Sequence, residues 1–129
     1  FMKIAEVVSE RSTCSRAKVG AVLVDITKRK IAAVGYNGSV PGSKHCIDHE
    51  CLEIKGHCRR TVHAELNAVL HLDSSSGNLV LYCTHQPCAE CWKALVTVGV
   101  HAIYFKHSYE DKVRDLLVME NPIIAWYKI

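Results

Sequence analysis

The chain changes between two hydrophobic periods, and each change marks the boundary of an expected element. Residues 2–12 carry apolar side chains at helical spacing with charged residues opposite them, which predicts an amphipathic helix. Two apolar, β-branched runs follow at residues 19–25 and 30–37, and the polar residues between them predict a hairpin. Residues 38–60 show no clean period and contain glycines, a proline, cysteines and histidines. We therefore expect a loop-rich excursion that needs something to hold it in place.

Regular periods return after residue 60 and continue to the end of the chain. The expected elements are a helix from residue 61 to the turn-forming run 74–77, a strand at 78–84, a helix at 88–98, a strand at 102–106, a helix at 110–119 and a strand at 123–128. Strands that alternate with helices after an initial hairpin predict an α/β fold. We expect a three-layer α/β/α sandwich with a mixed five-stranded sheet, formed by residues 1–129 as one domain.

Composition and charge narrow the functions that a chain with this expected fold can have. With 129 residues, of which 49% are hydrophobic, the chain can bury an ordinary globular core. Its formal net charge of +3 falls far below the basic loading of a protein that neutralises many nucleic-acid phosphates, so we expect no nucleic-acid partner. No apolar run approaches the roughly 20 residues that cross a bilayer, and residues 1–12 lack a signal-peptide core. These features favour a cytoplasmic protein without a membrane partner.

The cysteines favour metal binding over disulfide bonding. Seven is an odd number, which does not suit a closed disulfide framework, and eight histidines accompany them. Cys83 lies inside an apolar, strand-like run and suits the alternative role of a small buried apolar residue. Most of the others lie near histidines, so we expect metal ligands in a reducing compartment.

The strongest candidate chemistry combines His63 with Cys88 and Cys91. Catalytic zinc usually takes three protein ligands and leaves a fourth position for water, and one imidazole with two thiolates meets that rule. Cys88 and Cys91 are spaced i, i+3 at the start of an expected helix, so both can face one ion. A helix N-terminus also favours thiolate over thiol. These three residues are the predicted ligands of a catalytic zinc.

Glu65 is placed to move protons beside such a zinc. It follows His63 by two residues, so it can face a metal-bound water without being a ligand. When a metal-bound hydroxide attacks a carbon that bears an amine, a carboxylate can take the proton and return it to the ring nitrogen and the leaving ammonia. Cys-x-x-Cys alone also fits a structural zinc knuckle or a redox pair. Together with His-x-Glu upstream, Pro-Cys-x-x-Cys is the signature of zinc-dependent base deaminases.

Around this signature the sequence resembles the cytidine and deoxycytidylate deaminase superfamily, and most closely the deoxycytidylate (dCMP) deaminases. The resembling segments extend over nearly the whole chain and include residues 12–14, 18–22, 35–39, 45–46 and 57–68. Free-cytidine deaminases carry Cys-Ala-Glu where this chain has His63-Ala64-Glu65. The resemblance implies hydrolysis of dCMP to dUMP and ammonia, by attack of the metal-bound hydroxide on C4 of the pyrimidine with Glu65 as proton shuttle. This reaction supplies the precursor of thymidylate.

The resemblance also implies contacts with the base and the sugar of the substrate. The backbone amides around Ala64 and Cys88 are expected to orient the pyrimidine. Asn37 is expected to hydrogen-bond the sugar hydroxyl. The alternative is that Asn37-Gly38 is only a hairpin turn pair, which is a common use of that dipeptide.

The substrate phosphate and the base face need further side chains. A 5′-phosphate requires a cation or a nest of amides, and Arg16 is a candidate, with Lys18 and Arg60 as alternatives. Each of these cations can equally be a solvated surface charge. Family members place an aromatic residue beside the substrate, and Tyr109 fits that position better than Tyr104, for which core packing is the competing explanation.

A second metal site is expected outside the catalytic set, and its candidate ligands are Cys14, Cys46, Cys51, His57 and Cys58. Four of them can close a tetrahedral structural zinc site that orders a loop without a core of its own. Some dCMP deaminases have such a site, with cysteines matching Cys14 and Cys46. The choice among the other three stays open, and the alternative is reduced thiols without metal.

The resemblance implies assembly and regulation as well. Family members usually form homo-oligomers, as hexamers, and respond to dCTP and dTTP, with Mg²⁺ accompanying the nucleotide effector. Residues 71–74 lack the aromatic residue and the arginine that support this response in some relatives, so the sequence does not favour regulation.

Two rival functions stay open at the level of sequence. One is deamination of another base, such as adenosine in tRNA, guanine or a riboflavin precursor. Gln86 precedes Pro87 here, where the tRNA enzymes usually carry a glutamate. The other is a non-catalytic module that binds zinc or nucleic acid, and Glu65 argues against it because a purely structural zinc site has no use for that carboxylate.

Overall fold

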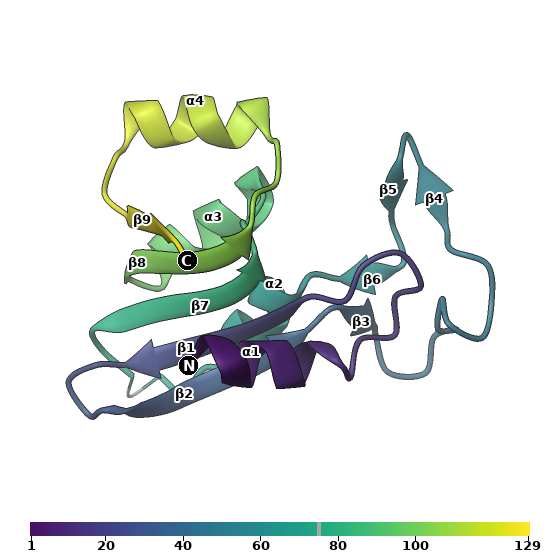
Figure 1. Ribbon diagram of the computed structural model, residues 1–129, viewed down its shortest axis with the longest axis horizontal. Coiled ribbons are helices and arrows are strands. Elements are labelled where there is room, and N and C mark those ends of the chain that lie inside the picture. The colour runs from purple at the N-terminus through teal and green to yellow at the C-terminus, as the bar shows by residue number, and fades with distance from the viewer. Residues whose placement is uncertain (75) are drawn as a thin grey trace.

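The computed structural model describes residues 1–74 and 76–129, and a mixed five-stranded sheet lies at its centre (Figure 1). Its strands are β1 (Gly20–Asp25), β2 (Lys30–Tyr36), β7 (Leu79–His85), β8 (Val100–His107) and β9 (Ala125–Lys128). The order across the sheet is β2-β1-β7-β8-β9. Strand β1 is antiparallel to both of its neighbours, whereas β7, β8 and β9 are parallel to one another.

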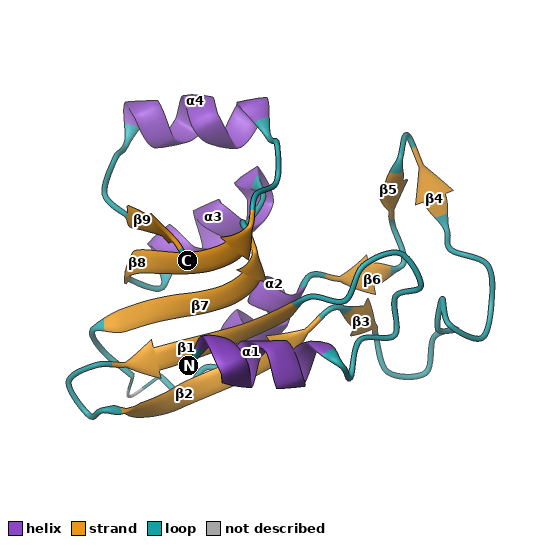
Figure 2. Cartoon of the chain, viewed as in Figure 1, coloured by secondary structure: helices purple, strands orange, loops and turns teal. Residues whose placement is uncertain are grey.

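Helices cover both faces of this sheet (Figure 2). They are α1 (Met2–Ser9), α2 (Ala64–Leu70), α3 (Ala89–Thr97) and α4 (Lys112–Glu120). Successive side chains of β1 point to opposite faces, so Val22 and Val24 pack with Ala5 of α1. Ala21 and Leu23 join the larger core on the other face, which also contains residues of α2 and α3. The structure confirms the expected three-layer α/β/α sandwich, with α4 packed outside α3.

Two glycines let a helix lie directly against the sheet. A Cβ on Gly35 of β2 would stand 2.2 Å from the carbonyl oxygen of Ala64 and 2.5 Å from the amide nitrogen of Ala68, both in α2. A Cβ on Gly20 of β1 would stand 2.0 Å from the carbonyl oxygen of Ala5 in α1. Only glycine permits these approaches, because any side chain would overlap the helix backbone.

The excursion between β2 and α2 contains short antiparallel pairs. Strand β3 (Gly38–Ser39) pairs with β6 (Thr61–Val62), and β4 (Glu53–Ile54) pairs with β5 (His57–Cys58) to form a hairpin that stands away from the main sheet (Figure 1). The expectation that a helix begins at residue 61 is wrong, since residues 61 and 62 belong to β6 and α2 begins at Ala64. Within the turn-forming run 74–77, residue 75 lies outside the described residues.

The other elements match the sequence expectations to within a few residues, and the first helix ends earlier than expected. Its helical hydrogen bonding stops at Ser9, and the chain turns at residues 10 and 11. None of the described helices has the length and hydrophobicity needed to span a lipid bilayer.

Candidate metal centre and active-site pocket

Three metal-ligating side chains meet where two helices begin. His63 is the N-cap of α2, Cys88 is the N-cap of α3, and Cys91 lies in the first turn of α3. Their ligand atoms all lie within 4.8 Å of one another. The Nδ1 atom of His63 is 3.5 Å from Sγ of Cys88 and 3.4 Å from Sγ of Cys91. At ordinary bond lengths a nitrogen and a sulfur on one tetrahedral zinc ion are about 3.6 Å apart, so these residues fit zinc.

The topology of the sheet explains why these helices begin at the same place. Parallel strands β7 and β8 are connected through α3, so α3 starts just beyond the carboxyl end of β7. Ligand sites in open α/β sheets lie at this edge. The buried Pro87 precedes Cys88 and fixes the backbone where the strand turns into the helix. The Ala64 carbonyl in α2 approaches Gly35, which keeps the other helix start close to the sheet.

The charges of the two cysteines differ in the site. The Cys91 thiol donates a hydrogen bond to Cys88, and together with His63 this lowers the pKa of Cys88 to about 4. The pKa of Cys91 is raised, first by the hydrogen bond that its thiol donates to Cys88 and then by burial. The Cys88 thiolate raises the pKa of His63. The site therefore holds one thiolate at neutral pH, and metal binding would release the proton of the second thiol.

Glu65 lies beside these groups and is almost completely buried. Its exposed fraction is 5%, although it lines the same cavity as His63 and Cys88. Burial raises the pKa of Glu65, while its own backbone amide and the charge of His63 oppose the shift. A carboxyl group whose pKa is raised toward neutrality is suited to accept and return a proton. This is the property that a proton shuttle needs.

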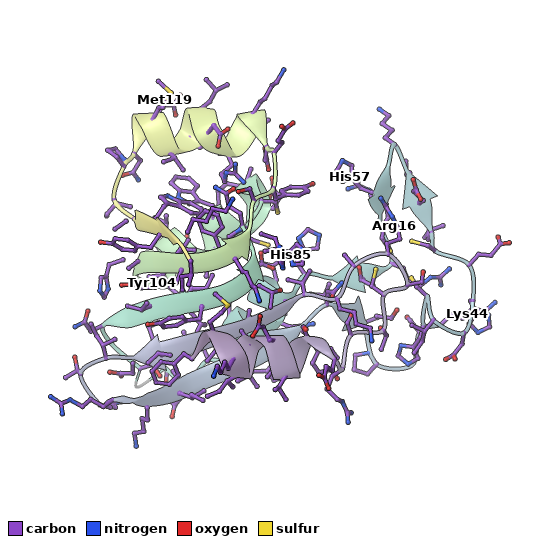
Figure 3. The ribbon with its side chains drawn as sticks, viewed as in Figure 1. Arg16, Lys44, His57, His85, Tyr104 and Met119 are labelled. Carbon is purple, nitrogen blue, oxygen red and sulfur yellow. The ribbon has the colours of Figure 1, made fainter. Side chains whose placement is uncertain are left out.

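The cavity in front of Glu65 has a volume of about 310 Å³. All four residues predicted to contact substrate line it, namely Arg16, Asn37, Ala64 and Tyr109. Lys18 and Arg60, the alternative cations, are not among its lining residues. His57 belongs to β5 and Arg16 lies beside the β4–β5 hairpin, whereas His85 lies at the end of β7, so the cavity is built from separate parts of the chain (Figure 3).

Asn37 holds together the loop that precedes β1. Its Oδ1 accepts a hydrogen bond from the Val19 amide at 2.8 Å, and its Nδ2 donates to the Ala17 carbonyl at 2.8 Å. Asn37 as a whole is 6% exposed, and it lines the cavity. Asn37 thus has a structural function in the described contacts, and the sugar contact stays a prediction.

Arg16 and Tyr109 lie on other walls of the cavity. Nη1 of Arg16 donates to the Gly56 carbonyl at 2.7 Å and lies 3.7 Å from a carboxylate oxygen of Glu53, which connects it to the β4–β5 hairpin. The Tyr109 amide donates to Oε1 of Gln86 at 3.2 Å. Tyr104 lies elsewhere, because its ring stacks between Tyr82 and Tyr127 on the sheet. Packing therefore accounts for Tyr104.

A second group of possible metal ligands lies in the excursion. The Sγ atoms of Cys46, Cys51 and Cys58 lie within 4.8 Å of one another, and those of Cys46 and Cys58 are 3.6 Å apart. Burial raises the pKa of Cys58, but bonds from the Arg60 amide and the Cys51 thiol outweigh it, so the pKa falls to about 6. The pKa of Cys51 rises to about 12 because its thiol bonds to Cys58. The spacing of these sulfurs fits a metal-thiolate site.

Two of the five candidates for the second site are not part of this three-cysteine group. Cys14 and His57 line the active-site cavity, together with Cys58. Cys58 therefore belongs both to the three-cysteine group and to the wall of the cavity. The backbone that leads to Cys14 is also tied to the excursion, because the Thr13 carbonyl accepts from the Ile47 amide at 3.1 Å.

Sequence reasoning missed His85 and Gln86 as lining residues of the cavity. His85 Nδ1 lies 3.0 Å from the Thr84 hydroxyl, which also accepts from the Gly20 amide at 3.2 Å. Burial lowers the pKa of His85, and the charge of His107 adds to the shift. Their positions in the sequence could have identified them, because His85 ends a buried strand and Gln86 directly precedes the Pro-Cys turn.

Comparisons of the sequence with a family model and with known proteins agree on one family. Residues 1–107 match the family model of the cytidine and deoxycytidylate deaminase zinc-binding region. The ComE operon protein 2 of Bacillus subtilis is 42% identical over 113 residues, and the deoxycytidylate deaminase of Saccharomyces cerevisiae is 30% identical over 129 residues. The matches cover 85% and 94% of this chain. The chain spans only 59% and 41% of the length of these two relatives.

A solved structure agrees over nearly the full length of both chains. The dCMP deaminase from the cyanophage S-TIM5, in complex with dCMP and dUMP, superposes with a TM-score of 0.81 at 31% sequence identity. The superposition covers 99% of this chain and 93% of the phage chain. The arrangement of sheet and helices is therefore that of a dCMP deaminase.

Proposed function

The chain belongs to the cytidine and deoxycytidylate deaminase family, and from that premise we propose that it hydrolyses dCMP to dUMP and ammonia with the help of zinc. The observation that carries the proposal is the meeting of His63, Cys88 and Cys91, at a cavity that His63, Cys88 and the buried Glu65 line. The phage structure that contains dCMP and dUMP supports a nucleotide substrate. The product feeds the synthesis of thymidylate in this proposal.

The residues of the chain divide the work of the reaction. Zinc, when bound, supplies a nucleophile at neutral pH by lowering the pKa of a water molecule. Glu65 takes one proton from the attacking water and delivers it to the ring nitrogen of the pyrimidine. It then takes the second proton, from the new hydroxyl at C4, and delivers it to the departing amine. The C4–N bond breaks, ammonia leaves, and a carbonyl oxygen remains at C4. Burial of Glu65 supports this function, because its raised pKa lets it both accept and return the proton.

The remaining cavity residues bind the nucleotide in the proposal. The Ala64 amide hydrogen-bonds the pyrimidine, Asn37 the sugar hydroxyl and Arg16 the 5′-phosphate, while Tyr109 packs beside the base. The position of all four around one cavity supports the assignment. Arg16 is suited to a phosphate because its planar guanidinium offers several donors, and the Gly56 carbonyl already orients it.

We also propose a structural zinc at Cys46, Cys51 and Cys58, with Cys14 or His57 as a candidate fourth ligand. The close spacing of the three sulfurs supports this site. All seven cysteines lie among the described residues and are free thiols. The cytoplasmic setting that the sequence suggests stays part of this proposal. Assembly into a homo-oligomer, as a hexamer, and control by dCTP and dTTP with Mg²⁺ complete the proposal by analogy with the family.

The test of the function is Glu65→Gln, which keeps the size of the side chain and removes its proton chemistry. We expect wild-type protein to release ammonia from dCMP faster than from deoxycytidine or tRNA, and Glu65→Gln to lose at least about 100-fold in kcat, the ordinary contribution of general acid–base catalysis. Zinc content, measured by mass spectrometry, should be unchanged in the variant. Glu90→Gln is the matched control, since Glu90 lies on the exposed face of α3 and pairs with Lys93.

Two results would contradict this proposal. Undiminished turnover in Glu65→Gln would remove the assigned proton shuttle. Faster deamination of tRNA adenosine or another base than of dCMP would replace the substrate with that of a rival deaminase.

A further inference from the structure

The first turn of α3 is capped by a residue of another helix. Amides at the start of an α-helix have no partner within the helix, and an oxygen of the N-cap side chain usually accepts from one of them. Cys88 is the N-cap of α3, and its sulfur lies 3.5 Å from Nδ1 of His63 at the proposed metal site. The Ala89 amide donates instead to Oδ2 of Asp111 at 2.8 Å.

Asp111 caps two helices with one carboxylate. It is the N-cap of α4, where its Oδ1 accepts from the Arg114 amide at 3.0 Å. Burial raises the pKa of Asp111. Hydrogen bonds from the amides of Arg114 and Ala89, together with the charge of Arg114, outweigh this effect, so the pKa is lowered overall. Asp111 is therefore a charged acceptor that joins the start of α3 to the start of α4.

Arg114 binds the same turn from its other side. Its side chain is buried, with an exposed fraction of 3% for the residue. Nη1 donates to the Pro87 carbonyl at 3.1 Å and to the Tyr109 carbonyl at 2.7 Å. Nε and Nη2 both donate to Oδ1 of Asp115, at 3.0 and 2.8 Å. A buried cation with this many partners is held in one position.

These contacts bracket Cys88. The Pro87 carbonyl belongs to the peptide that precedes Cys88, and the Ala89 amide belongs to the peptide that follows it. Both peptides are hydrogen-bonded to α4, so the backbone on each side of the sulfur ligand is fixed by residues that do not contact the metal site themselves. Helix α3 holds the backbone of its N-cap residue only on the side that follows it. The hydrogen bonds from Asp111 and Arg114 therefore determine where the Cys88 sulfur lies.

The same residues restrain one wall of the cavity. Arg114 binds the Tyr109 carbonyl, and the Tyr109 amide binds Gln86, which stands two residues before Cys88. The segment that carries Tyr109 and the turn that carries Cys88 are thus connected through Arg114. A displacement of α4 would move both together.

We propose that Asp111 and Arg114 form a clamp from α4 that positions Cys88 for the metal and Tyr109 for the substrate. Both are positioning residues, since they act through Cys88 and Tyr109. The inference rests on the proposed function, because it requires a metal at His63, Cys88 and Cys91. Loss of a partner that orients a metal ligand typically weakens metal affinity by about 10- to 100-fold.

The experiment uses Asp111→Ser, which separates the two functions of this side chain. Serine is about as good an N-cap as aspartate, so α4 keeps its own cap, but a hydroxyl cannot also reach Ala89. Glu110→Gln is the matched control, because it removes one negative charge from the exposed neighbouring residue. Zinc affinity is measured by competition with a chromophoric chelator. The sulfur-to-metal absorption of the Co²⁺-loaded protein reports the geometry at Cys88, and urea unfolding of the zinc-free protein reports stability.

We expect Asp111→Ser to bind zinc about 10- to 100-fold more weakly and to shift the Co²⁺ absorption, with zinc-free stability close to that of Glu110→Gln. Equal zinc affinity and equal Co²⁺ spectra in the two variants would overturn the clamp while leaving the proposed function intact. If Asp111→Ser does not fold, the isosteric Asp111→Asn is measured in the same way. A wild-type protein without zinc affinity would overturn the proposed function itself, and the clamp with it.

Discussion

Asp25 shows how one buried carboxylate can hold two distant segments. It ends β1 with an exposed fraction of 2%. Its Oδ1 accepts from the Lys28 amide at 2.9 Å in the hairpin turn, and its Oδ2 accepts from the Gly77 amide at 3.2 Å in the connection to β7. The bond from the Lys28 amide is the largest cause of a lowered pKa, below the ordinary value of 3.8.

A lowered pKa in the folded state makes stability depend on pH at the acid end. Asp25 stabilises the fold fully above its unfolded pKa near 3.8, and the contribution is lost as pH falls through the lower folded value. We therefore expect Asp25→Asn to unfold at lower urea concentration than wild type at pH 7, with the difference shrinking below about pH 3.8. The exposed Asp48→Asn is the control. A difference between Asp25→Asn and wild type that stays constant from pH 7 to pH 3 would contradict this assignment.

At the residue scale, the sequence predicted the site best where two functional residues lie only two or three positions apart, because that spacing limits where their side chains can lie. His63 and Glu65 share one helix start, and Cys88 and Cys91 share another, so the motif alone constrains each pair. It did not reveal Arg114, which looks like an ordinary charged residue near a helix start. Its burial depends on the packing of α4 against the Pro87 turn, a contact between segments 27 residues apart.

At the scale of elements, the contact between β2 and α2 determines where the proposed catalytic residues lie. Gly35→Ala would place a Cβ 2.2 Å from the Ala64 carbonyl, so α2 must move away and take His63 and Glu65 with it. We expect a loss of about 1–3 kcal/mol in the free energy of unfolding, the usual effect of overpacking. We also expect a loss of about 100-fold in kcat/KM, as a displacement near 1 Å can produce. Urea unfolding and steady-state kinetics with dCMP measure the two effects.

Gly20→Ala is the matched control for this prediction. Its Cβ would stand 2.0 Å from the Ala5 carbonyl, so the same change displaces α1, which carries none of the proposed metal ligands. Similar destabilisation with a much smaller loss of kcat/KM is expected. Equal kinetic losses in the two variants would show that overpacking acts through general destabilisation and that the position of α2 is not decisive.

Element boundaries were predicted well in the sheet and poorly in the excursion, for a physical reason. Strand β1 is buried on both faces, so its sequence is apolar up to Asp25, whose carboxylate is hydrogen-bonded. The segment between β3 and β6 has no such constraint, because its short pairs β4 and β5 depend on backbone bonds across a turn. Which of five candidate ligands meet in space was therefore not readable from spacing, and three of them form a compact group.

At the scale of the whole molecule, the excursion is a part without a hydrophobic core. Its large apolar side chains are exposed, including Ile47 at 57%, Leu52 at 48% and Ile54 at 51%. Yet it forms a wall of the cavity through Gly56, His57 and Cys58, and Arg16 binds it. Folding a segment that buries little apolar surface requires another source of free energy, and a structural metal is a source of that kind.

Removal of the proposed second metal should therefore loosen the excursion and leave the sheet intact. Wild-type protein is expected to contain two zinc ions per chain and Cys51→Ala one, with faster hydrogen exchange confined to residues 40–60 and a raised KM for dCMP, because the wall near Cys58 would no longer be fixed. Cys83→Ala is the control, since Cys83 is buried in β7 outside both cysteine groups and should keep both ions. One zinc per wild-type chain would eliminate the second site, whereas exchange spread evenly over the sheet in Cys51→Ala would mean that the metal stabilises the whole fold.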